Sequence, residues 1–198
     1  MAGRRGQVLD AAVQVLGTDG LGRVTYQQVD ARAGVPAGTA SNHFRNREAL
    51  LTGIVQHVAD LDRAAWDAFA AGARITGSTE LAEALLSYLR HAAGPDRART
   101  LARYRLFLEA ALRPDLRATL VDTRAEIVRW AGEQLARSGT PQPDERIRTL
   151  LDCVDGLLLH LVTVPDAPDP GPAVRDLTAG LLNAADPANA AGPEPGSS

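Results

Sequence analysis

Apolar residues recur at the spacing of an α-helix along most of this chain, and this pattern restricts the folds open to it. Residues 4–18 show it first, with one apolar face formed by Val8, Leu9, Ala12, Val13 and Leu16. Breaks containing glycine or proline separate the further helices expected over about 47–73, 79–93, 97–112, 115–138, 144–164 and 172–185. No segment shows the sustained alternation of a β-strand. The sequence therefore predicts an all-α fold.

The segment 24–44 predicts two short helices joined by a tight turn. Thr25 and Gln28 have the spacing of a capping box, which starts a helix that runs to about residue 33. Gly34 can adopt the backbone conformation that the turn requires, and a second short helix is expected over 36–43. Its side chains are mostly small or hydrogen-bonding, which suits a major groove about 12 Å wide better than a protein core. This arrangement predicts a helix-turn-helix that reads DNA.

Short motifs follow one another in order across residues 4–55, namely RGQVLDAA (5–12), VT (24–25), VDARAGV (29–35), GT (38–39), HF (43–44) and NREALL (46–51). Together they resemble the N-terminal domain of the TetR (tetracycline-repressor) family. The resemblance implies an N-terminal three-helix helix-turn-helix DNA-binding domain, here 1–46, and a C-terminal helical ligand-binding and dimerisation domain, here 47–186. Residues 187–198 are rich in Pro, Gly, Ala and Ser, which predicts a disordered tail.

Two positions in the second short helix depart from the family pattern. Ala37 stands where the family usually has a lysine, and Ser41 stands where it commonly has a tyrosine. Both positions often contact phosphate in the family. Arg47 occupies the position of a family lysine that usually caps the next helix near the DNA backbone, and Arg45 lies two positions before it. We expect these two arginines to supply compensating charge.

Residue types within the segment suggest individual roles on DNA. Thr25 and Gln27 are expected to bind phosphate, and a plain N-cap role for Thr25 is equally open. Asn42 can pair with adenine through two hydrogen bonds, and the Thr39 methyl can contact a thymine methyl. A phosphate contact or a solvated position is the alternative for Asn42, and His43 is expected to be packed or to face phosphate. The expected DNA-binding residues are Thr25, Gln27, Pro36, Ala37, Gly38, Thr39, Ser41, Asn42, His43 and Arg47.

Charge is distributed unevenly along the chain. The net charge is −3, and residues 1–52 carry +2, which leaves −5 for the rest. Such a protein does not coat nucleic acid by charge alone, but its basic N-terminal part suits contact with phosphate. The second short helix contains no arginine or lysine, so we expect its short polar side chains to set base specificity. Affinity is then expected from the flanking Arg4, Arg5, Arg23, Arg45 and Arg47.

The middle of the chain holds most of the aromatic residues, with polar residues among them. A helical bundle with such a lining could hold a small apolar or amphipathic ligand. Core packing is an open alternative for each aromatic residue, and Glu109 could instead be solvated or face a cation. The expected ligand-binding residues are Trp66, Tyr88, Tyr104, Phe107, Glu109, Trp130 and Cys153.

Wide apolar faces on helices 144–164 and 172–185 predict burial of both helices. Gly156 lies inside the first of them at a cost of about 1 kcal/mol, which favours close approach of another helix. The resemblance implies that the two helices pair with those of a second copy in a homodimer, and packing within one subunit is the alternative. Two recognition helices on a two-fold axis would read a palindrome with half-sites about 34–36 Å apart, or a multiple of that.

Sequence features of enzymes, metal sites and membrane proteins are missing. The four histidines lack the spacing of metal ligands, and there is no glycine-rich phosphate loop or nucleophile elbow. A single cysteine excludes an intrachain disulfide and a cysteine metal site. No apolar run reaches eighteen residues and the N-terminus lacks the pattern of a signal peptide. We therefore expect no catalysis, no cofactor, no membrane partner and a cytoplasmic location.

These observations lead to one functional prediction with one alternative. The resemblance implies a ligand-responsive dimeric repressor that binds a palindromic operator in double-stranded DNA and is released by an unidentified small molecule. The alternative is a DNA-binding or protein-interaction regulator that has no small-molecule pocket.

Overall fold

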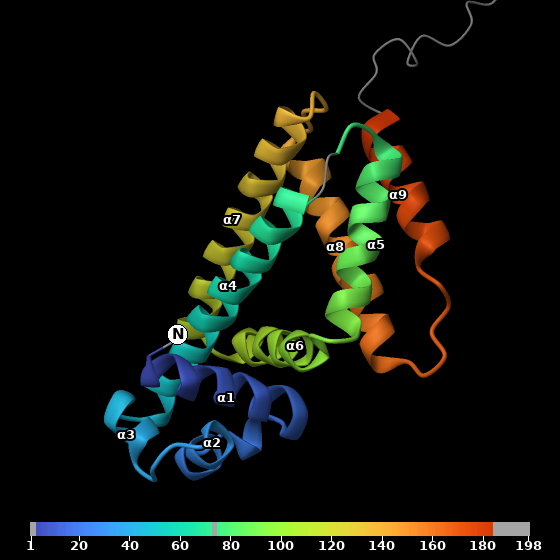
Figure 1. Cartoon of the computed structure of the whole chain (residues 1–198). Coiled ribbons are helices and arrows are strands. Elements are labelled where there is room, and N and C mark those ends of the chain that lie inside the picture. Colours follow the sequence, from blue (N-terminus) through green and yellow to red (C-terminus); the bar gives the residue numbers. More distant parts are fainter. Residues whose placement is uncertain (1–2, 73–74, 184–198) are drawn as a thin grey trace, which may run out of the picture. The chain divides into compact units, whose positions relative to one another are not determined.

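The computed structural model describes residues 3–72 and 75–183, and the tail predicted over 187–198 lies outside them. Every regular element among the described residues is helical, which confirms the predicted all-α class (Figure 1). The elements are α1 (Arg4–Asp19), the short 3₁₀ helix η1 (Leu21–Arg23), α2 (Tyr26–Ala33), α3 (Thr39–His43), α4 (Arg47–Gly72), α5 (Ser78–Ala93), α6 (Arg97–Leu112), α7 (Pro114–Arg137), α8 (Asp144–Thr163) and α9 (Gly171–Asn183).

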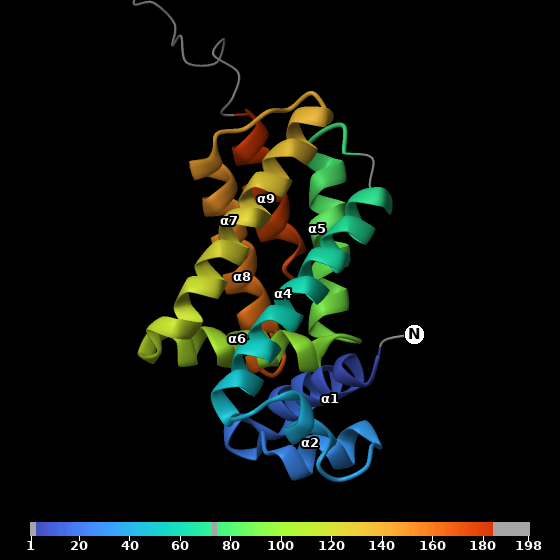
Figure 2. The same cartoon turned by 90° about the vertical axis from the view of Figure 1, so that its left-hand side faces the viewer.

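Packing divides the chain into two compact units. The first combines residues 1–68 with 90–126, and the second combines 69–89 with 127–198. Within the first unit α1 packs along α6 (Figure 2), and the predicted domains 1–46 and 47–186 stay a prediction. The helix-turn-helix segment 24–44 shares a core with a helix that comes about fifty residues later in the chain.

The core of the first unit lies where α1 meets α4 and α6. Val15 and Leu16 of α1, Ile54 of α4 and Leu106 of α6 are all fully buried there. Gly17 approaches α6 so closely that a Cβ at this position would overlap the carbonyl group of Ala98. A glycine is required here by the space available, and the two backbones meet without a side chain between them.

A buried polar cluster also joins α4 to α6. Asp62 is 6% exposed, and its carboxylate oxygens lie 3.5 Å from Arg99 Nε and 3.5 Å from Arg103 Nη1. Arg99 also donates a hydrogen bond of 3.0 Å to the Leu61 carbonyl and pairs with Asp96. Burial raises the pKa of Asp62, and the two arginines oppose that rise without cancelling it.

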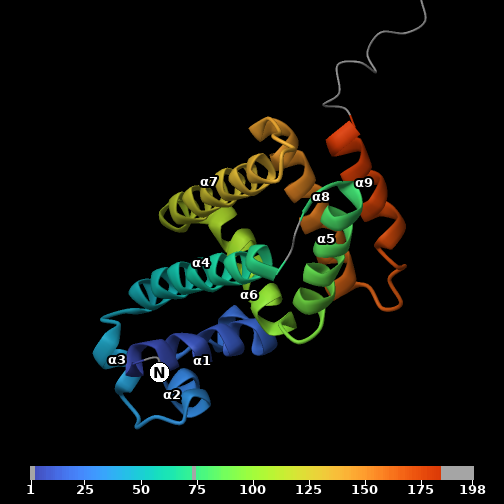
Figure 3. The ribbon, with the colours of Figure 1, turned by 45° about the horizontal axis from the view of Figure 1, so that its top comes forward.

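The second unit contains the packed pair α8 and α9 (Figure 3). Leu158 of α8 and Val174 of α9 are completely buried, and Arg146 donates a hydrogen bond of 3.4 Å to the Leu181 carbonyl. Other positions on the same helices are open: Leu159 is 43% exposed, and a Cβ built on Gly156 or Gly180 would meet no atom within 4 Å. These two helices thus bury one set of side chains and expose another.

Candidate DNA-binding site

The first short helix of the helix-turn-helix segment 24–44, α2, begins as the sequence predicts. Thr25 has an extended backbone, and its hydroxyl oxygen accepts a hydrogen bond of 3.3 Å from the backbone N–H of Gln28. Gly34 ends the helix in the left-handed conformation, with φ 64°. Gln27 is exposed beside the cap. The cap and the glycine turn are confirmed, and the phosphate contacts of Thr25 and Gln27 stay predictions.

A buried carboxylate that the sequence patterns did not predict holds the start of α3. Asp30 is 3% exposed, and its two oxygens accept hydrogen bonds from the backbone N–H groups of Gly38 and Ala40, each at 2.8 Å. Gly38 has φ 91°, a conformation that other residues rarely adopt. The helix begins at Thr39 rather than near residue 36, because residues 36–38 form the turn that reaches Asp30. The available signal in the sequence for this contact was the acidic Asp30 eight positions before Gly38.

Side chains on α3 divide into those that bond locally and those that are free for a partner. The Thr39 hydroxyl donates to the Pro36 carbonyl at 2.6 Å, and the Ser41 hydroxyl donates to the Gly38 carbonyl at 3.0 Å. Both oxygens can still accept a hydrogen bond, and the Thr39 methyl keeps its apolar surface. Asn42 is exposed, and its side-chain amide makes no hydrogen bond to the described part of the chain. Of these three residues, Asn42 alone can both donate and accept towards a base edge.

The residue after α3, Phe44, anchors the segment to the rest of the unit. Its ring is 4% exposed, and its carbonyl accepts a hydrogen bond of 2.6 Å from the Tyr26 hydroxyl. The guanidinium carbon of Arg5 lies 5.3 Å from the ring centroid, within the range of a cation–π contact. Gly53 of α4 lies so close that a Cβ would come within 2.7 Å of the ring. The contacts with Tyr26, Arg5 and Gly53 together fix the position of Phe44.

The start of α4 is fastened on two sides. Asn46 caps it, because its side-chain oxygen accepts a hydrogen bond of 2.8 Å from the backbone N–H of Ala49. Arg47 donates a hydrogen bond of 3.0 Å to the Leu21 carbonyl in η1. Arg45 is exposed in the loop between α3 and α4. The expected phosphate contact of Arg47 stays a prediction, and its observed bond places the guanidinium beside η1.

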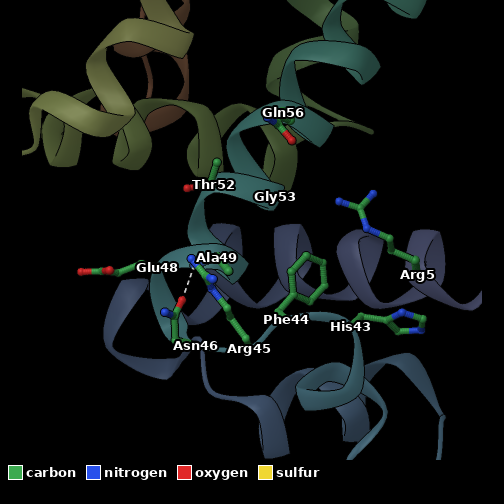
Figure 4. Close-up of a pocket in the computed structure, with 10 residues that line it drawn as sticks. All are labelled: Arg5, His43, Phe44, Arg45, Asn46, Glu48, Ala49, Thr52, Gly53 and Gln56. Carbon is green, nitrogen blue, oxygen red and sulfur yellow. Dashed lines mark hydrogen bonds between the residues drawn. The ribbon is translucent and has the colours of Figure 1, made fainter.

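An open pocket of about 490 Å³ lies beside Phe44, between the beginnings of α1 and α4 (Figure 4). We call it the Arg5–Phe44 pocket. Figure 4 shows Arg5 reaching it from α1, while the other lining residues come from the end of α3, the loop after it and one face of α4. The lining residues are Arg5, His43, Phe44, Arg45, Asn46, Glu48, Ala49, Thr52, Gly53 and Gln56.

Family models match both parts of the chain. The model described as bacterial regulatory proteins, tetR family, matches residues 8–54, and the model of a tetracyclin repressor-like C-terminal domain matches residues 76–184. The chain belongs to the TetR family. Its helix-turn-helix is therefore that of a TetR-family transcription regulator, which confirms the resemblance seen in the motifs from residue 5 to residue 51.

Solved structures of TetR-family proteins share the fold. A TetR-family member from Streptomyces coelicolor A3, SCO1917, is 27% identical with a TM-score of 0.68, over 91% of this chain and 99% of that one. The multidrug binding protein EbrR, complexed with proflavin, is 29% identical with a TM-score of 0.60, over 91% and 100% of the two chains. Complexed with malachite green, EbrR gives 26% identity and a TM-score of 0.64, over 91% and 99%. No curated protein sequence matches this TetR-family chain.

The residues expected to bind a ligand divide between the two units of this TetR-family chain. In the first unit Trp66 is buried and Phe107 is 38% exposed, with its ring centroid 6.3 Å from that of Tyr104. Glu109 is half-buried, and its carboxylate lies 4.0 Å from the guanidinium of Arg113. The second unit holds the buried Tyr88 and the half-buried Trp130 and Cys153. A common pocket for these residues stays a prediction.

Two negative findings apply to the described residues alone. No helix among them has both the length and the apolar character needed to cross a membrane. Among these residues, no three His, Cys, Asp or Glu side chains lie close enough together to hold a metal ion.

Proposed function

We propose that this TetR-family chain is a repressor that binds a palindromic operator as a homodimer and leaves it when a small molecule binds. The proposal rests on one observation: α3 is fixed on its inner side and exposed on its outer side. Its start is fixed by the Asp30 carboxylate, its inner residue Ala40 is completely buried, and the Asn42 amide is exposed. A helix held in this way can enter a major groove without reorganising, so little conformational entropy is lost on binding.

Direct base contacts are assigned to α3. Asn42 would pair with adenine, and the Thr39 methyl would lie against a thymine methyl. Ser41 would act as an acceptor, because its proton is engaged with the Gly38 carbonyl. Thr25 and Gln27 at the start of α2 and Arg47 at the start of α4 would bind the flanking phosphates.

Dimerisation is assigned to α8 and α9. Both helices carry glycines with open space around them, Gly156 and Gly180, and Leu159 is exposed on α8. Small residues allow helices of a second copy to approach closely, and burial of the exposed leucine would favour association. A two-fold dimer would place two copies of α3 on successive turns of the same DNA groove.

Release by a small molecule requires two states of the protein, with the ligand favouring the one that binds DNA poorly. The solved complexes of EbrR with proflavin and malachite green, both aromatic cations, support a ligand of that class here. We assign the contact to the aromatic residues Trp66, Tyr88, Tyr104, Phe107 and Trp130, together with Glu109 and Cys153. Because the DNA partner lies in the bacterial cytoplasm, the protein would act there.

Operator binding can be tested without knowing the target gene. The full chain is used to select duplexes from a random pool, and the enriched sequence is measured by gel shift at a fixed salt concentration. We expect a palindrome bound by two chains, with mass measured by light scattering on the complex. Enrichment of no common sequence over several rounds would contradict the proposal.

Ligand binding can be followed by the fluorescence of the two tryptophans, Trp66 and Trp130. Proflavin and malachite green are titrated into the protein alone and into the operator complex. We expect quenching that saturates, with release of DNA over the same concentration range. Trp66→Phe and Trp130→Phe variants show which tryptophan reports the ligand. Absence of saturable quenching by either dye would support the alternative of a regulator that has no small-molecule pocket, and quenching without release of DNA would contradict the proposed release.

A further inference from the structure

The Arg5–Phe44 pocket has the charge of an anion site. Neither Arg5 nor Arg45 forms an ion pair with a carboxylate in the described part of the chain, whereas Arg32 lies 3.0 Å from Asp19. The one acidic residue in the lining is Glu48, and its carboxylate lies 3.9 Å from the guanidinium of Arg113, the residue that follows α6. Figure 4 shows the Glu48 side chain extending away from Phe44. Among the described residues, the pocket therefore keeps two positive charges without a carboxylate partner.

One of these charges is already held in place. The Arg5 guanidinium lies over the ring of Phe44, and the ring is fixed by Tyr26 and by the close approach of Gly53. The cation–π contact leaves the guanidinium N–H groups of Arg5 without an acceptor among the described residues, so they can still donate. A phosphate oxygen could therefore be bound at a smaller cost in side-chain entropy than by a mobile arginine.

The pocket also touches the DNA-reading helix. His43, the last residue of α3, lines it, as does Arg45 in the loop that follows. A DNA strand that passes along α3 would continue towards Arg5 at the start of α1, and a duplex carries a phosphate on each nucleotide. The amides of Asn46 and Gln56 add polar groups to the same lining.

We propose that the Arg5–Phe44 pocket binds one backbone phosphate of each operator half-site, outside the base pairs that α3 reads. Arg5 and Arg45 donate to the phosphate oxygens from α1 and from the loop before α4. The inference rests on the proposed operator binding and adds a defined phosphate position to it. Through this contact, α1 would join α2 and α3 in setting the register of the protein on DNA.

The test is a double-mutant cycle between Arg5→Gln and single neutral methylphosphonates placed along the selected operator. We expect Arg5→Gln to weaken wild-type operator binding about 10-fold, and one methylphosphonate per half-site to weaken wild-type protein by a similar factor. Combined, the two changes should weaken binding no more than either does alone. The salt slope of log Kd should also fall by about 1 for each phosphate that the variant protein no longer neutralises.

Arg4→Gln is the matched control, because Arg4 is exposed, carries the same charge and does not line the pocket. Equal losses of operator affinity in the two variants, with additive effects at every methylphosphonate, would overturn the inference. The contribution of Arg5 would then come from the general positive charge of the N-terminus and not from a contact with one phosphate. A wild-type protein that selects no operator would instead contradict the proposed function itself.

A free phosphate ion could bind the Arg5–Phe44 pocket in place of a DNA backbone phosphate. Inorganic phosphate is titrated against the operator complex at constant ionic strength, with chloride as the replaced ion. We expect no competition at millimolar phosphate. Competition that Arg5→Gln abolishes, without coupling to any methylphosphonate, would assign the pocket to a free phosphate compound and overturn the DNA contact.

Discussion

One carboxylate oxygen of Asp30 lies 2.8 Å from the backbone nitrogen of Ala40, in the first turn of α3. The second oxygen accepts the N–H group two residues earlier, at the same distance. A single buried side chain of α2 thus satisfies two donors that the short α3 leaves open. Hydrogen bonds to a charged acceptor contribute about 1.5–3 kcal/mol each, which is large for a helix with so few residues.

Replacing Asp30 with asparagine is expected to loosen the start of α3. Asn keeps one acceptor oxygen and turns an NH₂ group towards a backbone N–H, so one hydrogen bond is lost and two donors face each other. We expect a loss of about 1–3 kcal/mol in unfolding free energy, measured in urea, and a larger loss in operator affinity. Asp19→Asn, on the surface, is the control. An operator affinity unchanged in Asp30→Asn would contradict this role.

We expect one variant to change the base sequence that the protein prefers, and another to weaken phosphate binding alone. Asn42→Ala should change the sequence that the protein selects, at a cost of about 1–3 kcal/mol on the original operator. Arg47→Ala should weaken every sequence alike and flatten the salt dependence of binding. Selection experiments and salt titrations on both proteins check this division. If the two variants behave alike in both measurements, α3 does not read bases through Asn42.

Gly17→Ala is expected to separate α1 from α6. A methyl group here would overlap the Ala98 carbonyl, and neither backbone can avoid it by rotating a side chain. We expect a loss of about 1–3 kcal/mol in unfolding free energy. The matched control is Gly22→Ala, since a Cβ on Gly22 meets nothing within 4 Å. Thermal unfolding that shifts equally in both variants would show that the close contact does not matter for stability.

Stability is expected to depend on pH through Asp62. Because burial raises the pKa of this carboxyl above its usual value of 3.8, the folded protein holds the proton more tightly than the unfolded chain. The contribution of Asp62 to the free energy of unfolding is therefore fully present below about pH 4, and it is lost as the pH rises through the raised pKa. Asp62→Asn should remove that loss, so its stability relative to wild type should increase with pH.

Urea unfolding at several pH values between about 4 and 7 checks this expectation for Asp62. The control is Asp60→Asn, an exposed position two residues away. A difference between wild type and Asp62→Asn that stays constant across this range would show that Asp62 has the same proton affinity in both states.

Local patterns in the sequence were sufficient for most helices and for their ends. Thr25 and Gly34 bound α2 as predicted, because an N-cap and a left-handed C-terminal glycine act within a few residues of the helix they end. The start of α3 was predicted near residue 36, and it begins at Thr39 because the turn before it bends towards Asp30. A proline at position 36 fits a tight turn as well as a first helical turn.

Contacts between distant residues were beyond the same patterns. Arg5 and Phe44 are separated by 39 positions, and nothing in the local sequence of either predicts that one lies over the other. Gly17 is an ordinary helix residue in the sequence, and its importance comes from Ala98 in a helix about eighty residues away. Such relationships depend on how α1 crosses its neighbours, which periodicity does not specify.

The contact of Gly17 with Ala98 has a mechanical consequence. Elsewhere in a protein core, a small shift of one helix can be absorbed when side chains between two helices change rotamer. Here the two main chains are in direct contact, so no side chain between them can rearrange to absorb a displacement of α6. Any force that moves this end of α6 would be passed directly to α1, and α1 carries the arginine that lies over Phe44, the residue that follows α3.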